Sequence, residues 1–351
     1  MRHFAVGVCA AVLVGGFLYS RALGQSNPEK PSARQLPQTI SDVARRYMES
    51  LPDPATVPAA PAADDVAGWK RAFEANEAAN EPRMKSALAR YRPTVEERKI
   101  GGVAVLDVKP RGWKDNGKVL VHAHGGGYTL NTARVRLQSS AAAADATGLR
   151  VLSIDYSVAP GAKWEQVTDE VVAVFEGLKQ EGFEPTDIAA YGESAGGGLI
   201  AGAILKLRDK GHAMPAAIVL WSPWADITDS GDSAITLATQ DPIYRYAEHL
   251  KSSADAYADP QDQKHPYVSP IYGDYTKGFP PTLIQGGTRE IFLSHFVRLC
   301  RKIDGDGQRA VLDLYDGMPH VFQIRPELAD APETKAALKK MAAFLKEHLT
   351  K

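Results

Sequence analysis

Ser194 lies in a sequence context that can turn a hydroxyl group into a nucleophile. Residues 192–196 read GESAG, which fits the pattern G-x-S-x-G. The apolar run at 188–191 is long enough for one buried strand, and the segment after the motif, ending at Gly211, has apolar side chains at helical spacing. A serine between a strand and a helix sits at the helix N-terminus, where backbone N–H groups face developing negative charge. This context, a nucleophile elbow, predicts covalent catalysis through Ser194.

The glycines on either side of Ser194 support this interpretation. The elbow is a tight turn with a strained backbone, so any Cβ atom at Gly192 or Gly196 would crowd it. The alternative is a chance match in a turn of small residues, because the pattern alone is weak evidence. The strand and helix around the motif, together with the motifs below, favour the elbow.

A second motif, HGGG at 124–127, follows a strand-like run at 118–123. Consecutive glycines leave backbone N–H groups uncovered, so an anion can approach them closely, as an oxyanion hole requires. A merely flexible loop is the alternative, and the position of the motif after a strand and before the elbow makes it less favoured. Nucleotide binding fits poorly, because a G-x-G-x-x-G pattern and a phosphate-loop lysine are both absent here.

His320 is the candidate base. It lies in a Gly-Met-Pro turn just after the last strand-like run, at 310–317. A position beyond the C-terminal end of a strand brings it near the elbow, whereas a purely structural histidine is the alternative. The histidines that lie in strand, helix or loop contexts without this setting are His122, His212, His249, His265 and His348.

Five motifs in this order carry a family resemblance. They are HGGG at 124–127, DYSVAP at 155–160, GESAGG at 192–197, SPWADIT at 222–228 and GMPHVF at 317–322. Together they resemble the hormone-sensitive-lipase-like α/β-hydrolases, which are bacterial carboxylesterases with some lactone hydrolases. The resemblance covers roughly residues 40–350.

This resemblance implies an α/β-hydrolase sheet with a helical cap. It also implies that Ser194 is the nucleophile, that His320 is the general base, and that His124 braces its loop. The backbone N–H groups that would form the oxyanion hole belong to Gly126, Gly127 and Ala195. No metal or organic cofactor is needed for this chemistry.

The acid of the triad is harder to identify. The chain order Ser, acid, His places it between the elbow and His320, and the family places it after the strand-like run at 281–287. The usual Asp-Pro-Leu-like motif is missing there. Glu290 is the only carboxylate in this loop, and it resembles the Glu variant of the family.

Other carboxylates remain as alternatives to Glu290. Asp304 or Asp306 could serve from the next loop if Glu290 instead pairs with Arg289 or another cation, although the helix before them should carry them to the opposite edge of the sheet. Asp313 and Asp316 lie too near His320 in sequence and look like strand and turn residues.

Strand-like and helix-like segments alternate from residue 100 onward. This alternation predicts an α/β domain at 100–351 with a mostly parallel central sheet and helices on both faces. Residues 37–99 look helical, with an interruption at Pro82 and no strand. With an insertion at about 226–268, they are predicted to form a helical cap over the site.

The N-terminal residues predict export. Residues 1–24 combine a short cationic start, an apolar run and a small-residue cleavage pattern near Gly24 and Gln25, as in a signal peptide, with an uncleaved anchor as the alternative. A disordered linker is expected at 25–36. The protein is then periplasmic or secreted, with no stable membrane span after cleavage.

The whole chain narrows the choice of partners and functions. A net charge of −1 gives no reason to expect a nucleic-acid partner, and a homodimer is left open. The leading hypothesis is a serine carboxylic-ester hydrolase that acts on short-chain acyl esters or lactones through an acyl-enzyme. The alternative from another class is a catalytically inactive α/β-hydrolase fold that binds a small molecule. A serine peptidase on this fold would usually bring a large additional domain.

Overall fold

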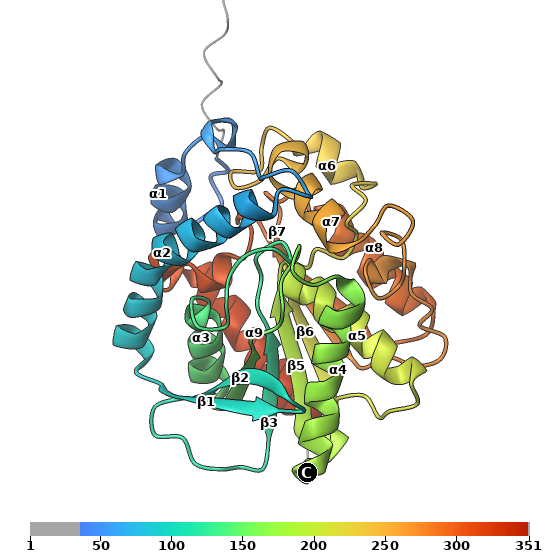
Figure 1. Ribbon diagram of the computed structural model, residues 1–351. Helices are drawn as coiled ribbons and strands as arrows, with labels where there is room; N and C mark the ends of the chain where they lie inside the picture. The colour runs from blue at the N-terminus through green and yellow to red at the C-terminus, as the bar shows by residue number, and fades with distance from the viewer. Residues whose placement is uncertain (1–35, 350–351) are drawn as a thin grey trace, which may run out of the picture. The chain divides into compact units, whose positions relative to one another are not determined.

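The computed structural model describes residues 36–349 of the 351-residue chain. The predicted signal peptide at 1–24 and the predicted linker at 25–36, except for its last residue, lie outside the described residues. The described residues include an eight-stranded sheet with the strand order β1-β2-β4-β3-β5-β6-β7-β8 (Figure 1). The strands are β1 (Thr94–Ile100), β2 (Val103–Lys109), β3 (Val119–Ala123), β4 (Arg150–Ile154), β5 (Ile188–Glu193), β6 (Ala217–Trp221), β7 (Thr282–Gly287) and β8 (Ala310–Tyr315).

The strand pairing is mostly parallel. β1 and β2 are antiparallel, with Thr94 opposite Lys109 and Ile100 opposite Val103, and β2 is also antiparallel to β4. All later neighbours in the sheet are parallel. Every residue of β3, β5, β6 and β7 is buried, because helices cover both faces of a parallel sheet. The predicted α/β class is therefore confirmed.

Helices cover both faces of the sheet, and some of them also lie at the end of the sheet where the parallel strands terminate (Figure 1). The α-helices are α1 (Asp42–Ser50), α2 (Val66–Tyr91), α3 (Leu137–Thr147), α4 (Trp164–Gln180), α5 (Ala195–Asp209), α6 (Asp232–Thr236), α7 (Lys251–Tyr257), α8 (Leu293–Gly305) and α9 (Pro332–His348). Shorter helical turns are η1 (Pro54–Thr56), η2 (Pro185–Asp187), η3 (Tyr246–Leu250), η4 (Pro270–Tyr272), η5 (Phe322–Ile324) and η6 (Pro326–Leu328).

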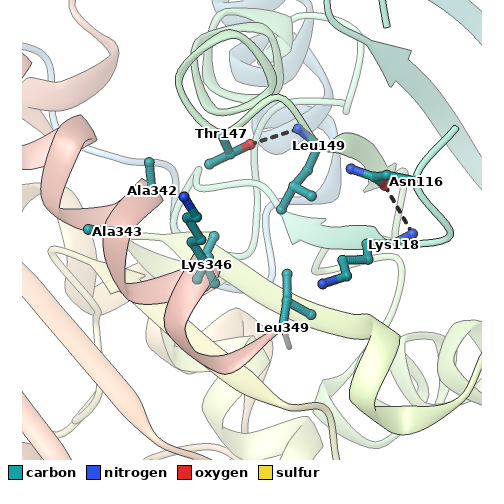
Figure 2. Close-up of a pocket in the computed structure, with 9 residues that line it drawn as sticks. Asn116, Lys118, Thr147, Leu149, Ala342, Ala343, Lys346 and Leu349 are labelled. Carbon is teal, nitrogen blue, oxygen red and sulfur yellow. Dashed lines mark hydrogen bonds between the residues drawn. The ribbon is translucent and has the colours of Figure 1, made fainter. Parts of the chain in front are cut away.

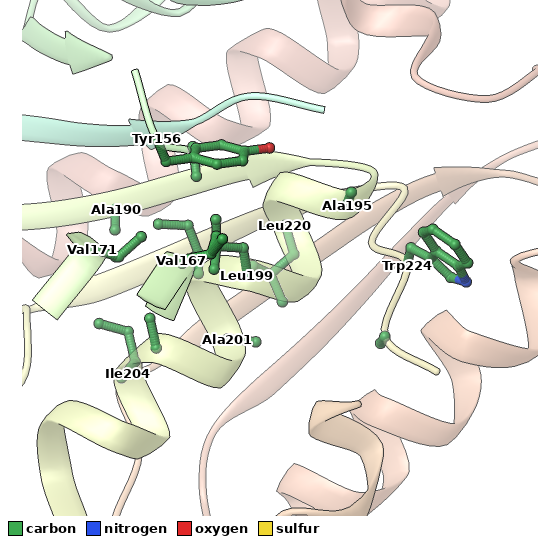
Figure 3. Packing of buried hydrophobic residues seen from close by; sticks show 14 of the residues in the cluster. Tyr156, Val167, Val171, Ala190, Ala195, Leu199, Ala201, Ile204, Leu220 and Trp224 are labelled. Carbon is green, nitrogen blue, oxygen red and sulfur yellow. The ribbon is translucent and has the colours of Figure 1, made fainter. Parts of the chain in front are cut away.

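The core consists of one apolar layer on each face of the sheet. Successive side chains of a strand point to opposite faces. Ala190 of β5 therefore packs with α4, α5 and α8, whereas its neighbour Ala189 packs with α3 and α9. Figure 3 shows the first layer, where Val167 of α4 and Leu199 of α5 lie against the sheet beside Leu220 of β6. This packing holds β5 and α5 firmly on either side of the elbow.

Strand β1 corrects the prediction that residues 37–99 contain no strand. It lies at the edge of the sheet, and its sequence TVEERKI is mostly exposed or half-buried. An edge strand that faces solvent needs no apolar run, so apolar periodicity could not reveal it. The segment that can belong to a cap therefore ends with α2 rather than at residue 99.

Helix α2 corrects a second prediction, because it continues through Pro82 without interruption. A proline inside a helix removes the hydrogen bond to the carbonyl four residues earlier, here that of Ala78. Both residues are exposed, so water can solvate the freed carbonyl.

Helix α3 was not predicted, because its residues 137–144 are all buried and it lacks the polar face that marks an amphipathic helix. Ser41 caps α1, since its side chain accepts a hydrogen bond from the N–H of Ala44. The insertion at about 226–268 contains α6, η3 and α7.

Candidate active site

Ser194 occupies a strained turn between β5 and α5. Its backbone has φ 57° and ψ −124°, in a region that side chains rarely adopt. A Cβ atom at Gly192 would lie 2.3 Å from the carbonyl oxygen of Gly196, and one at Gly196 would lie 2.1 Å from that of Ala123. The predicted crowding at both glycines is therefore confirmed. The strain is held by backbone hydrogen bonds, including one of 2.9 Å from the N–H of Ser194 to Trp221.

His320 and Glu290 are brought together from the ends of adjacent strands. Glu290 follows β7, His320 follows β8, and the distance from His320 Nδ1 to Glu290 Oε2 is 2.7 Å. Both side chains are buried, with exposed fractions of 2% and 0%. The second oxygen of Glu290, Oε1, accepts hydrogen bonds from the Ser222 hydroxyl at 2.8 Å and from the Gly287 N–H at 2.6 Å.

Within residues 36–349, none of the alternative carboxylates is hydrogen-bonded to His320, and three of the four have other partners. Asp306 accepts hydrogen bonds from Lys302 and from the N–H of Tyr275, and Asp304 is exposed. Two further carboxylates near the end of β8 are also engaged away from the imidazole. Asp313 binds Gln285, Tyr315 and Lys340, and Asp316 binds Thr39 and Thr288.

Burial sets the protonation of the pair. Burial lowers the pKa of His320, which keeps the imidazole neutral near pH 7 and therefore able to accept a proton. Burial raises the pKa of Glu290, and the hydrogen bonds from Gly287 and Ser222 act against this rise. When Glu290 is ionised, its Oε2 can only accept a hydrogen bond from Nδ1–H, which leaves the lone pair of the neutral ring on Nε2.

The HGGG loop is fixed around its first glycine. The N–H of Gly125 donates to Glu193 Oε1 at 3.1 Å, and its carbonyl accepts from Asn131 Nδ2 at 2.7 Å. Gly126 and Gly127 have φ values of 138° and 64°. Within residues 36–349, neither of their N–H groups has a hydrogen-bond acceptor, so both can bind an external oxygen.

His124 supports this loop from within the protein. Its ring stacks on Tyr156 with centroids 4.2 Å apart, and its Nδ1 lies 3.0 Å from the carbonyl oxygen of Gly125. Burial lowers the pKa of His124 to about 4, so the ring is neutral. It does not line the cavity at the elbow.

Two residues without an assigned role in the sequence help to position the pair. Ser222 has φ 47°, donates its hydroxyl to Glu290 and accepts a hydrogen bond of 3.1 Å from the N–H of Val321. Asp241 is buried and accepts hydrogen bonds from the N–H groups of Ile243, Tyr244 and Ile291. The SPWADIT motif contains Ser222 and was the sequence feature that could have pointed to it. No motif contains Asp241.

Several of the catalytic candidates line one cavity of about 200 Å³. Ser194, His320, Gly126 and Gly127 all line it, together with side chains from α2 and from the 243–253 segment. A larger cavity, of about 500 Å³, lies beside α9 and is lined by Asn116, Thr147 and Leu149 among others (Figure 2). Its lining, as far as residues 36–349 form it, has no serine, histidine or carboxylate and so offers no nucleophile–base pair.

Comparison with known proteins identifies the class. Residues 120–324 match a family model described as alpha/beta hydrolase fold, and the chain belongs to this family. An acetyl-hydrolase from Streptomyces hygroscopicus is 33% identical over 66% of this chain and 77% of that protein. An esterase from Acinetobacter venetianus is 30% identical over 72% of this chain and 82% of that protein.

Solved structures agree with this assignment. A crystal structure of an esterase superposes with a TM-score of 0.80 and 31% identity, covering 93% of this chain and 99% of that one. An esterase from the bacterial hormone-sensitive lipase family gives a TM-score of 0.74 and 30% identity, covering 88% of this chain and 99% of that one. The resemblance to hormone-sensitive-lipase-like esterases is therefore confirmed.

The described residues, 36–349, bear on two further features. No helix in this range is both long and apolar enough to span a membrane. No group of three or more His, Cys, Asp and Glu side chains in this range is arranged to hold a metal ion.

Proposed function

We propose that this protein is a serine carboxylesterase that hydrolyses short-chain acyl esters or lactones through an acyl-enzyme. The observation that carries the proposal is the Glu290–His320 hydrogen bond together with the cavity that both His320 and the strained Ser194 line. The relatives named esterase and acetyl-hydrolase support the same activity. Because the cavity measures only about 200 Å³, it favours small acyl groups.

The reaction follows from the groups around the cavity. His320 Nε2 takes the proton of Ser194 as its Oγ attacks the ester carbonyl, while Glu290 holds the imidazole tautomer and stabilises its cation. The N–H groups of Gly126, Gly127 and Ala195 stabilise the oxyanion of the tetrahedral intermediate. The alcohol leaves with the proton from His320, and water then hydrolyses the acyl-enzyme.

The inactive small-molecule binding protein is not supported. Such a protein normally loses the serine or the histidine, and this chain keeps both together with a buried acid hydrogen-bonded to the histidine. A panel of 4-nitrophenyl esters from acetate to laurate tests the proposal. We expect the highest kcat/KM for acyl chains of two to four carbons. This value should be on the order of tenfold or more above that for laurate, because the discrimination per methylene group is modest. Absence of hydrolysis across the whole panel would refute the proposal.

The Gly126→Ala variant tests the oxyanion role. A Cβ atom at Gly126 would lie 2.1 Å from the carbonyl oxygen of Leu130, at a φ of 138°, so the loop must shift and its donor is displaced. Loss of one oxyanion donor costs about 3 kcal/mol in the barrier, so kcat should fall about 10²- to 10³-fold. Gly148→Ala is a matched control, because φ there is 70° and nothing lies within 4 Å of the new Cβ. An unchanged kcat in Gly126→Ala would contradict the role.

The pH dependence of kcat/KM should follow His320. Activity requires the neutral imidazole, so it is lost as the pH falls through the pKa of His320. Because burial lowers this pKa below the ordinary value of 6.5, the acid limb should lie below pH 6.5. The measurement is kcat/KM for 4-nitrophenyl acetate between pH 4 and 8, and an acid limb above pH 6.5 would contradict the expectation.

The cap is proposed to consist of residues 37–91 together with the insertion at about 226–268. In Figure 1, α1 and α2 lie at the same end of the sheet as α6 and α7. The two segments meet directly, since the N–H of Ala60 donates to the carbonyl of Glu248 at 2.8 Å. Helix α2 also reaches the HGGG loop, where Asn76 donates to Asn131 at 2.6 Å. These contacts support a lid that shapes the substrate cavity.

Export to the periplasm or medium is proposed from the sequence of residues 1–24. The expected result is a mature protein that begins near Gln25, and intact-mass spectrometry of the periplasmic and secreted fractions would measure it. Recovery of a chain with Met1 in the membrane fraction would instead support an uncleaved anchor. The sequence leaves a homodimer open, and light scattering of the mature protein would distinguish it from a monomer.

A further inference from the structure

The substrate cavity carries concentrated positive charge. Three arginines line it, and among residues 36–349 no aspartate or glutamate does. Arg83 comes from α2, Arg136 immediately precedes α3, and Arg325 follows η5, so three separate segments bring these side chains to one space. Ser194 and His320 line the same cavity.

Within the part of the chain that the structure describes, one of the three guanidinium groups has a carboxylate partner and two do not. Arg136 donates to Glu193 Oε1 at 3.2 Å, and Glu193 is itself held by His122. Arg83 donates to the amide oxygen of Asn80 at 3.2 Å, and Arg325 donates to the carbonyl oxygen of His320 at 3.2 Å.

Arg83 and Arg325 each donate few of the hydrogen bonds that a guanidinium group can form. The Nε of Arg325 is buried and has no acceptor within the described part of the chain. Neither side chain forms a salt bridge with a carboxylate of residues 36–349. Glu327 compensates part of the charge of Arg83 without forming a salt bridge with it.

The clustering of these arginines lowers the stability of the folded protein. Burial and the neighbouring charges of Arg325 and Arg136 lower the pKa of Arg83, while Glu327 raises it, with a net lowering. Charged groups that are partly desolvated and close to like charges destabilise a protein unless an opposite charge joins them. Arginine presents a planar fork of donors that matches a carboxylate. The missing opposite charge is therefore best supplied by a ligand.

We propose that the substrate is an ester that also bears a carboxylate, and that Arg83 and Arg325 bind this carboxylate while Ser194 attacks the ester carbonyl. The proposal rests on the esterase function above and narrows its substrate class. Arg136, neutralised by Glu193, contributes long-range attraction but is not the binding group. The proposal covers a carboxylate on either the acyl or the alcohol side of the ester, because both present the same anion to the same arginines.

The test compares anionic and neutral esters of matched shape. On the acyl side, mono-4-nitrophenyl glutarate is compared with 4-nitrophenyl valerate, and on the alcohol side 4-acetoxybenzoate is compared with 4-acetoxybenzamide. In at least one pair, the anionic ester should have a kcat/KM about tenfold or more above its neutral partner, with the advantage shrinking as salt is added. A preference for the neutral ester in both pairs would overturn the proposal.

Arginine variants then assign the preference to residues. Arg83→Gln and Arg325→Gln should each lower the ratio of anionic to neutral kcat/KM about 10- to 100-fold, because each removes a charge-assisted hydrogen bond. Arg83→Lys should restore part of the ratio. Arg134→Gln, at an exposed arginine outside this cavity, is the control and should leave the ratio unchanged.

The outcomes separate this proposal from the esterase function itself. If the Arg83 and Arg325 variants lose activity equally on both esters of a pair, their role is structural and the carboxylate site is refuted. If the wild-type protein hydrolyses neutral esters without any anionic preference, the esterase function stands and the carboxylate site fails. If it hydrolyses neither ester of either pair, the esterase function fails.

Discussion

Replacement of Ser194 by alanine is expected to abolish ester hydrolysis while leaving the fold intact. The proposed mechanism passes every substrate through a bond to this oxygen, and loss of a catalytic serine reduces kcat by about 10⁶-fold in a comparable triad. Alanine keeps the Cβ atom that the strained backbone already accommodates at φ 57°. The backbone hydrogen bonds of residue 194 to Trp221 and Trp224 need no side-chain oxygen.

The measurement is turnover of 4-nitrophenyl acetate, with circular dichroism and the melting temperature as tests of folding. Ser140→Ala is a matched control, because Ser140 is also a buried serine but lies on α3 and hydrogen-bonds only to the carbonyl of Leu137. That variant should keep its activity. Retention of more than a few per cent of turnover by a folded Ser194→Ala variant would refute the nucleophile assignment.

The chemistry of the site was readable from the sequence because each group follows a recognisable strand. Ser194, Glu290 and His320 come after β5, β7 and β8, and the carboxyl ends of parallel strands meet at one edge of a sheet. Apolar runs mark buried strands clearly. The sequence could therefore predict both the layers of the fold and the neighbourhood of these three residues.

The supporting contacts could not be predicted, because they join residues far apart in the chain. Asp241 binds the N–H of Ile291, 50 residues away, and Asn76 binds Asn131 across 55 residues. Neither pair lies in a motif or follows a periodic pattern. The arginines of the substrate cavity are a similar case, since nothing in the sequence around Arg83 or Arg325 indicates that they meet.

Gly286 and Gly287 lie just before Glu290. Their lack of a side chain could serve to adjust the loop to the longer glutamate side chain. In the structure they permit close approach instead. A Cβ atom at Gly287 would lie 1.9 Å from the carbonyl oxygen of Met318, and one at Gly286 would lie 2.2 Å from the Phe296 ring. The missing side chains let the end of β7 pack directly against the turn that carries His320.

The Glu290→Gln variant is expected to lose about 10²- to 10⁴-fold in kcat, by analogy with other triad acids. Glu290 Oε1 accepts two hydrogen bonds, from Gly287 and Ser222, so the amide oxygen of a glutamine will occupy that position. Its NH₂ group then faces His320 Nδ1, where Glu290 Oε2 lies 2.7 Å away in the wild-type protein. An NH₂ donor makes Nδ1 an acceptor and places the ring proton on Nε2, the wrong tautomer for taking the proton of Ser194.

The same argument predicts how related variants rank. Glu290→Asp keeps the charge but is one methylene shorter, so it should lose less than Glu290→Gln while failing to reach His320 as closely. Asp306→Asn is the matched control, because Asp306 is engaged by Lys302 and Tyr275 and should leave kcat unchanged. Steady-state kinetics on 4-nitrophenyl acetate measure all three. Near-wild-type kcat in Glu290→Gln, with a large loss in an Asp304 or Asp306 variant, would show that the acid has been misassigned.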